Sequence, residues 1–163
     1  MAKLNILTFP DPRLRKVAVT VTKFDKSLEK ITSDMLETMY EENGIGLAAT
    51  QVDYHERIIV MDISEERNEP KIFINPEFKI LNDKSLLSFS EGCLSVPGVT
   101  EEIIRPDSIT LNWQDINGQK YQEEPSGLLT VCIQHEIDHL EGKLMVDYLS
   151  PLKRDRIRKK ASK

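Results

Sequence analysis

The chain has 163 residues, 39% of them hydrophobic and 30% charged, which is typical of a single soluble globular domain spanning residues 1–163. The net charge of −5 is uneven, because Lys153–Lys163 carries +6 and the rest of the chain −11, and such an acidic body argues against a DNA-binding protein. The chain has two cysteines, no signal-peptide core and no long apolar run. We therefore expect a cytoplasmic protein without a membrane segment or a disulfide scaffold, and a single disulfide between the two cysteines is the alternative.

The first regular element expected along the chain is a helix that follows Asp25. Before it, Ile6–Pro12 is expected to be extended and Arg13–Ala18 to form a short basic turn. Apolar residues then recur every three or four positions up to Tyr40, which is helical spacing. Asp25 is a suitable N-cap, and Asn43-Gly44 is a natural end for the helix.

The next segment, Gly44–Val52, follows neither helical nor strand periodicity. Its sequence is Gly-Ile-Gly-Leu-Ala-Ala-Thr-Gln-Val, and its small residues would let a ligand or another segment lie against the main chain. A tight structural turn is an equally good interpretation. The segment lacks the further residues of a phosphate-binding loop.

Short strands and turns are expected through the middle of the chain. The strand candidates are Arg57–Ile63, Lys71–Ile74, a stretch from Pro76 to Ile80 and an extended segment Ser85–Pro97 closed by Pro97-Gly98. Asn117-Gly118 then predicts a hairpin between Ile109–Trp113 and Gln119–Glu123.

Two more helices are expected, Leu128–Glu141 with Gly142 at its end and Pro151–Ala161 with proline in its first turn. Helices and strands do not alternate, which indicates an α+β fold. We expect short, mostly antiparallel strands around the central helix, followed by the basic C-terminal helix at 151–163.

The central helix carries the motif H-E-x-x-H at His135, Glu136 and His139. Residues four apart share one face of a helix, so both imidazoles can reach one metal ion, and Glu136 is placed to take a proton from water. The alternative is a pair of half-buried histidines on an amphipathic helix.

A catalytic metal usually takes a third protein ligand. His55 stands beside the charged residues Glu56 and Arg57 in an expected loop, where it should be solvated. Cys132 is seven residues from His139, about 10 Å along a helix, which metal bonds cannot bridge. Cys93, from a separate segment, has no such restriction and is the predicted ligand. A nucleophilic Cys93–His pair and a purely structural zinc site are weaker alternatives.

Three separated motifs together resemble those of the peptide deformylase family. They are Gly44–Gln51, Glu91-Gly92-Cys93-Leu94-Ser95 and Gln134–His139, and the likeness continues into Val146–Leu152. The spacing is most similar to the Gram-negative type. The resemblance implies removal of the formyl group from the formylmethionine of nascent polypeptides.

The resemblance also implies a set of site residues. The ligands would be Cys93, His135 and His139, holding one divalent ion, Fe²⁺ in the cell, with Zn²⁺, Ni²⁺ or Co²⁺ also able to bind. Glu136 would be the general base and acid, and Gln51 and the Leu94 amide would donate to the oxyanion. A tight fit against Gly46 would exclude larger acyl groups. The methionine pocket would be formed by Ile45, Leu128, Val131 and Cys132, for each of which core packing is an alternative.

In such enzymes the basic C-terminal helix is associated with the ribosome near the tunnel exit, and a basic helix suits anionic rRNA. An unengaged, solvated helix is the alternative. The sequence departs from the family pattern at Thr100, where some relatives carry an arginine near the bound peptide. Thr100 cannot supply that charge, so the resemblance does not say how the peptide is recognised at this position. Arg105 is expected to be a structural ion-pair partner.

Overall fold

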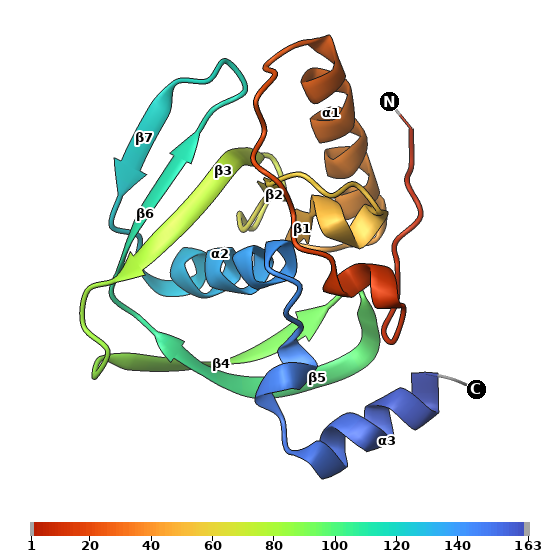
Figure 1. Ribbon diagram of the computed structural model, residues 1–163. Coiled ribbons are helices and arrows are strands. Elements are labelled where there is room, and N and C mark those ends of the chain that lie inside the picture. The colour runs from red at the N-terminus through yellow and green to blue at the C-terminus, as the bar shows by residue number, and fades with distance from the viewer. Residues whose placement is uncertain (1, 162–163) are drawn as a thin grey trace.

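The computed structural model describes residues 2–161 and places the helix α2 (Gly127–Leu140) between a five-stranded sheet and a two-stranded hairpin (Figure 1). The sheet has the order β1-β2-β3-β6-β7, and all of its neighbouring strands are antiparallel. Its strands are β1 (Gly46–Ala48), β2 (Ile58–Met61), β3 (Lys71–Ile80), β6 (Ile109–Gln114) and β7 (Lys120–Glu123). The hairpin pairs β4 (Leu86–Cys93) with β5 (Val96–Pro106).

The sheet is buried on both faces where β2 runs through it. Ile58 and Val60 pack in a cluster with residues of α1 (Lys26–Glu41), whereas Ile59 and Met61 pack in a second cluster with residues of α2. Because successive side chains point to opposite faces of a strand, both sets must be apolar. This explains the nearly continuous apolar run in the sequence.

Both ends of α1 agree with the sequence prediction. Asp25 Oδ1 accepts hydrogen bonds from the amides of Ser27 and Leu28, as an N-cap does. Asn43 has φ +58°, a left-handed conformation that ends the helix directly before Gly44. The end of α1 therefore delivers the chain into β1, at one edge of the sheet.

Three expectations for the connecting segments need correction. The stretch Lys71–Ile80 is one strand, interrupted by a change of register between Ile74 and Glu77 around Pro76, which has no N–H to donate. The hairpin turns at Leu94-Ser95, so Pro97-Gly98 lies within β5. Gly44–Val52 contains β1 and a short 3₁₀ helix, Ala49–Val52, although its small residues hide the strand pattern.

The α+β fold class, the hairpin after Ile109 and the last helix are confirmed. The hairpin β6–β7 turns at Asn117-Gly118, and α3 (Pro151–Ala161) has the predicted bounds. A 3₁₀ helix, Pro12–Arg15, replaces the expected basic turn, and another, Met145–Tyr148, leads into α3. The molecule is an α+β protein with three α-helices among the described residues, as expected.

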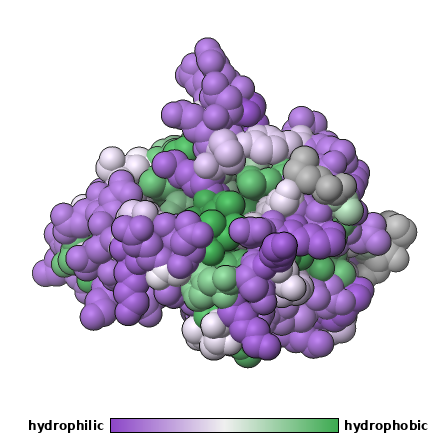
Figure 2. All heavy atoms as spheres, turned by 90° about the horizontal axis from the view of Figure 1, so that it is seen from above, coloured by the Kyte–Doolittle hydropathy of each residue, from purple (hydrophilic) through white to green (hydrophobic). Residues whose placement is uncertain are grey.

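The face seen in Figure 2 is mainly hydrophilic, with hydrophobic residues gathered in its middle. α3 extends from the body, and no residue of it is fully buried (Figure 1). No helix within residues 2–161 is both long enough and apolar enough to cross a membrane.

Candidate active site

The helix α2 presents two different faces to its neighbours. Ile133, Ile137 and Leu140 pack into the apolar cluster under the sheet. The H-E-x-x-H residues lie on the other side, toward the hairpin β4–β5, and His135 and His139 are only 7% and 1% exposed. Burying two imidazoles costs free energy unless they have partners, so their surroundings matter.

Cys93, at the end of β4, lies beside both histidines. Its Sγ is 3.3 Å from His139 Nε2, and one donor atom from each of Cys93, His135 and His139 lies within 4.8 Å of the others. A thiolate and two imidazoles suit a borderline divalent ion, whose bonds would be about 2.0–2.3 Å long. The residues present therefore fit a metal ion.

A buried ionic network fixes the orientation of His135. Its Nδ1 lies 2.9 Å from Glu91 Oε1, and the Arg105 guanidinium holds Glu91 with contacts of 2.6 and 2.8 Å. Burial opposes ionisation of Glu91, but hydrogen bonds from Arg105 and His135 hold its pKa below the usual value. A carboxylate only accepts, so Nδ1 carries the proton and Nε2 keeps its lone pair for a metal.

The network continues from Arg105 to Asp138 of α2 and to Tyr148. Arg105 donates to Asp138 Oδ2 at 2.9 Å, and the hydroxyl of Tyr148 donates to the same oxygen at 2.7 Å. The guanidinium also lies over the Tyr148 ring, 4.9 Å from its centroid. Arg105 is thus the ion-pair partner expected, with two carboxylates around it.

Glu136 is buried beside the donor cluster. Its Oε1 is 3.8 Å from His135 Nε2, while its Oε2 has no hydrogen-bond partner within the described residues. Burial raises the pKa of Glu136 to about 7. A Cβ added to Gly46 would stand 3.0 Å from Glu136 Oε1, so any larger residue there would crowd the carboxylate.

Gln51 is held close to Cys93 by contacts at both ends of its carboxamide. Oε1 accepts the amide of Ala48 at 2.9 Å, and this turns Nε2 toward Ser95 Oγ at 3.0 Å and Cys93 Sγ at 3.7 Å. Leu94 follows Cys93 in the hairpin turn. Both predicted donors therefore lie around the same sulfur.

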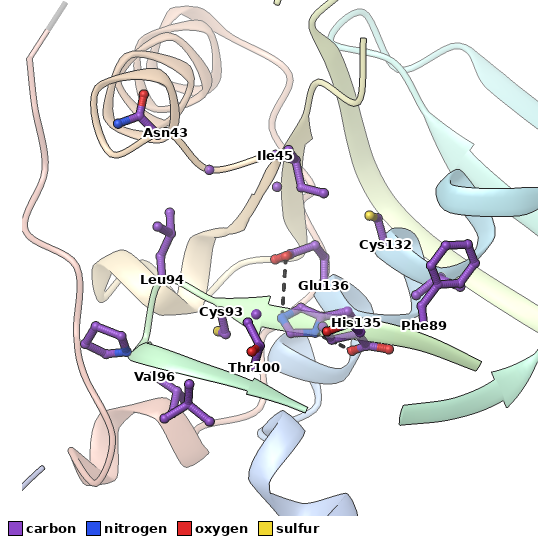
Figure 3. A pocket seen from close by; sticks show the side chains of 18 of the residues that line it. Asn43, Ile45, Phe89, Cys93, Leu94, Val96, Thr100, Cys132, His135 and Glu136 are labelled. Carbon is purple, nitrogen blue, oxygen red and sulfur yellow. Dashed lines mark hydrogen bonds and ion pairs between the residues drawn. The ribbon is translucent and has the colours of Figure 1, made fainter. Parts of the chain in front are cut away.

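A cavity of about 590 Å³ is lined in part by Cys93, Leu94, His135 and Glu136. Figure 3 shows His135 and Glu136 pointing into it between Ile45 on one side and Cys93 and Thr100 on the other. Five predicted pocket residues line it: Ile45, Gly46, Leu128, Val131 and Cys132. Gln51 and His139, each only 1% exposed, are not among the residues that line it.

The other two candidate ligands stand apart from the donor cluster. Burial raises the pKa of the Cys132 thiol to about 12, so it stays protonated and suits an apolar wall. His55 is not simply solvated, since its Nε2 lies 2.8 Å from Asp53 Oδ1 on the other side of a turn. Among the described residues, neither Cys132 nor His55 belongs to the donor cluster that contains Cys93.

Sequence reasoning missed the supporting roles of Glu91, Ser95, Asp138 and Tyr148. Three of the four, Glu91, Ser95 and Asp138, stand within the motifs. A ligating histidine usually donates its second N–H to a carboxylate, so the sequence offers Glu91 as a candidate for the acceptor that His135 needs. The contacts of Tyr148 and Ser95 depend on the tertiary fold and have no local signal.

Comparison with known proteins gives the same family throughout. Residues 3–155 match a family model described as polypeptide deformylase. The peptide deformylases of Stutzerimonas stutzeri and Pseudomonas aeruginosa are each 57% identical over 163 residues, covering 100% of this chain and 96% of the relative. The crystal structure of the Legionella pneumophila enzyme matches with a TM-score of 0.91 and 43% identity, over 99% of this chain and 94% of that one. The Ehrlichia chaffeensis enzyme in complex with actinonin gives 0.93 and 41%, over 99% and 97%.

Proposed function

Because the chain belongs to the polypeptide deformylase family, whose members are enzymes that remove the N-formyl group from nascent peptides, we propose that it hydrolyses the formyl amide of N-terminal formylmethionine and releases formate. The observation that carries this proposal is the convergence of Cys93, His135 and His139 beside a buried Glu136, with a cavity lined by Cys93, His135 and Glu136. The catalytic domain would comprise residues 1–163.

The family uses a divalent metal ion, and the Cys93, His135 and His139 cluster can hold one. The finer proposal is that these three residues are the ligands and that Fe²⁺ is the ion in the cell, with Zn²⁺, Ni²⁺ or Co²⁺ as substitutes. The mixed sulfur and nitrogen donor set supports it. When bound, the ion supplies a Lewis acid that polarises the formyl oxygen and acidifies water.

The protein side chains then have separate tasks. Glu136 takes the proton of the attacking water and returns it to the leaving amine, for which its unpartnered Oε2 is free. Gln51 Nε2 and the Leu94 amide donate to the formyl oxygen as negative charge develops. The contacts of Gln51 with Ala48 and Ser95 preorganise this donor.

The cavity walls suit an extended peptide that begins with methionine. β1 is an edge strand, and no described strand pairs with its outer side, so a peptide can add to it by main-chain hydrogen bonds. Apolar side chains accept the methionine: Ile45, Leu128, Val131 and Cys132. Gly46 brings the main chain close to Glu136, and this supports the expectation that a formyl group fits there and a larger acyl group does not.

The cellular setting proposed is the cytoplasm, at the ribosome. α3 bears six basic residues in the described part of the chain, and its side chains are mostly exposed. Arg154 donates to the carbonyls of Val146 and Asp147, and Arg158 lies over the Phe9 ring, so the helix is held against the body. Arg156, Lys159 and Lys160 stay exposed. Such a surface suits rRNA near the tunnel exit.

The proposal is tested by release of formate from formyl-Met-Ala-Ser and from its acetyl analogue. We expect metal-dependent release from the formyl peptide and no hydrolysis of the acetyl peptide. Cleavage of internal peptide bonds would instead indicate a general metalloprotease. Ribosome binding without any metal-dependent turnover would indicate a non-catalytic relative.

A further inference from the structure

The segment Gly44–Gly46, which leads into β1, forms one wall of the cavity and has few side-chain contacts of its own to hold it. Two of its three residues are glycines, and Ile45 is 41% exposed. A Cβ on Gly44 would lie 2.7 Å from Leu94 Cδ1, and one on Gly46 would lie 3.0 Å from Glu136 Oε1. A small shift of this segment would therefore change the space beside two residues with proposed roles, so something else must fix its position.

Arg67 provides that support from outside the cavity. One of its terminal nitrogens donates to the carbonyl of Gly44, and the other donates to the carbonyl of Asp62 at 2.7 Å. The guanidinium also lies over the Tyr40 ring, 5.2 Å from its centroid. The planar group of arginine can serve two carbonyls and one aromatic face together, which lysine cannot do.

The buried carboxylate of Asp62 holds the loop that carries Arg67 in one conformation. It accepts hydrogen bonds from the amide and hydroxyl of Ser64, the amide of Glu69 and the hydroxyl of Tyr40. The Asp62 amide donates to the carbonyl of Ile45 at 2.9 Å. Arg67 has φ +59°, a conformation that non-glycine residues keep only when surrounding contacts impose it. The loop and the cavity wall thus form one connected unit.

We propose that Arg67 is a positioning residue for the peptide substrate, holding Gly44–Gly46 at the distance from Leu94 and Glu136 that an extended formyl-peptide requires. This rests on the proposed function, because the peptide is taken to lie along β1. Arg67 does not line the cavity, so it acts through Gly44. Its loss should weaken binding of the peptide main chain more than the chemical step, and it should leave the metal ligands untouched.

The test compares Arg67→Met and Arg67→Lys with Arg57→Met. Arg57 is a matched control, since it also joins a backbone carbonyl (Pro76, 2.7 Å) and another group (Glu141, 2.6 Å), but away from the cavity wall. For Arg67→Met we expect KM for formyl-Met-Ala-Ser to rise about tenfold, the size expected for losing one charge-assisted hydrogen bond, with kcat changed less and metal content unchanged. Arg67→Lys should recover part of the loss, and Arg57→Met should keep both constants.

A second readout is the affinity for the product peptide Met-Ala-Ser, measured by calorimetry, because it needs no turnover. A wild type that binds this peptide but releases no formate would defeat the proposed function; weaker binding by Arg67→Met would then still support the positioning role. If Arg67→Met kept the KM and the Met-Ala-Ser affinity of the wild type, the positioning role would be wrong, whereas the proposed function would stand. Equal losses in Arg57→Met and Arg67→Met would also overturn it, because they would reflect stability in general.

Discussion

His135 Nδ1 lies 2.9 Å from Glu91 Oε1, which ties a residue of α2 to the end of β4 across 44 positions of sequence. The contact fixes the tautomer of the imidazole and its direction, and Arg105 keeps the carboxylate charged. The geometry of the donor cluster therefore depends on a residue that would not itself touch the metal ion.

Replacing Glu91 by Gln should lower metal affinity by about 10–100-fold, the usual effect of losing the carboxylate behind a ligating histidine. Competition with a chelator measures it. Glu102→Gln is the control, because the Glu102 side chain lies on the same hairpin and, within the described residues, accepts a hydrogen bond only from Ser88 Oγ. Equal metal affinities in Glu91→Gln and the wild type would show that Glu91 does not support His135.

Replacing Glu136 by Gln should keep the metal ion and reduce formate release by about 10²–10⁴-fold, the range for removing a general acid–base. The amide has nearly the same shape as the carboxyl group but cannot accept the proton. Formate release and elemental analysis on the same preparation check both parts. Full activity in this variant would rule out Glu136 as the proton carrier.

Features of the fold and the site that depend on residues close together in the sequence could be predicted, whereas contacts between distant segments could not. The spacing of His135 and His139 and the exclusion of Cys132 follow from helix geometry alone, and Asp25 and Asn117-Gly118 are local signals for a cap and a turn. The hairpin turn at Leu94-Ser95 was misplaced because Pro97-Gly98 looks like a better turn, although both residues continue into β5.

The contacts between distant segments had no such signal. Ser95 meets Gln51, and Tyr148 meets Asp138, only because α2, the hairpin and the 3₁₀ helices pack together. The strand Gly46–Ala48 was missed for a related reason. Glycine and alanine have low strand propensity, and the pairing with β2 overrides it.

Asp147 should contribute to stability at neutral pH but not in acid. Burial opposes its ionisation, but the Arg15 guanidinium (2.6 and 2.9 Å) and the Leu144 amide lower its pKa. A lowered pKa stabilises the fold above the unfolded value of about 4, and this contribution is lost as the pH falls below it.

The variant Asp147→Asn should therefore be less stable than wild type at pH 7, by about 1 kcal/mol for a partly exposed ion pair, and the difference should shrink below about pH 4. Urea unfolding at several pH values measures it. Asp155→Asn, which breaks an exposed pair with Lys159, should have a smaller effect. A difference that stays constant down to pH 3 would contradict the electrostatic explanation.

Reversing charges on α3 should separate ribosome binding from catalysis. In Arg156→Glu/Lys160→Glu we expect co-sedimentation with ribosomes to be lost at low salt, since phosphate contacts dominate such binding. Neither residue lines the active-site cavity, so kcat/KM for formyl-Met-Ala-Ser should stay within about twofold of wild type. Ribosome binding that is unchanged by the reversal and insensitive to salt would exclude α3 as the docking surface.

The most direct test of the whole account is metal content and ligand type in anaerobically purified protein, compared between the wild type, Cys93→Ala and Cys132→Ala. X-ray absorption should find one divalent ion per chain with one sulfur and two imidazole ligands in the wild type and in Cys132→Ala, while Cys93→Ala should lose most of its metal. An ion without a sulfur ligand, or full metal content in Cys93→Ala, would contradict the proposed site.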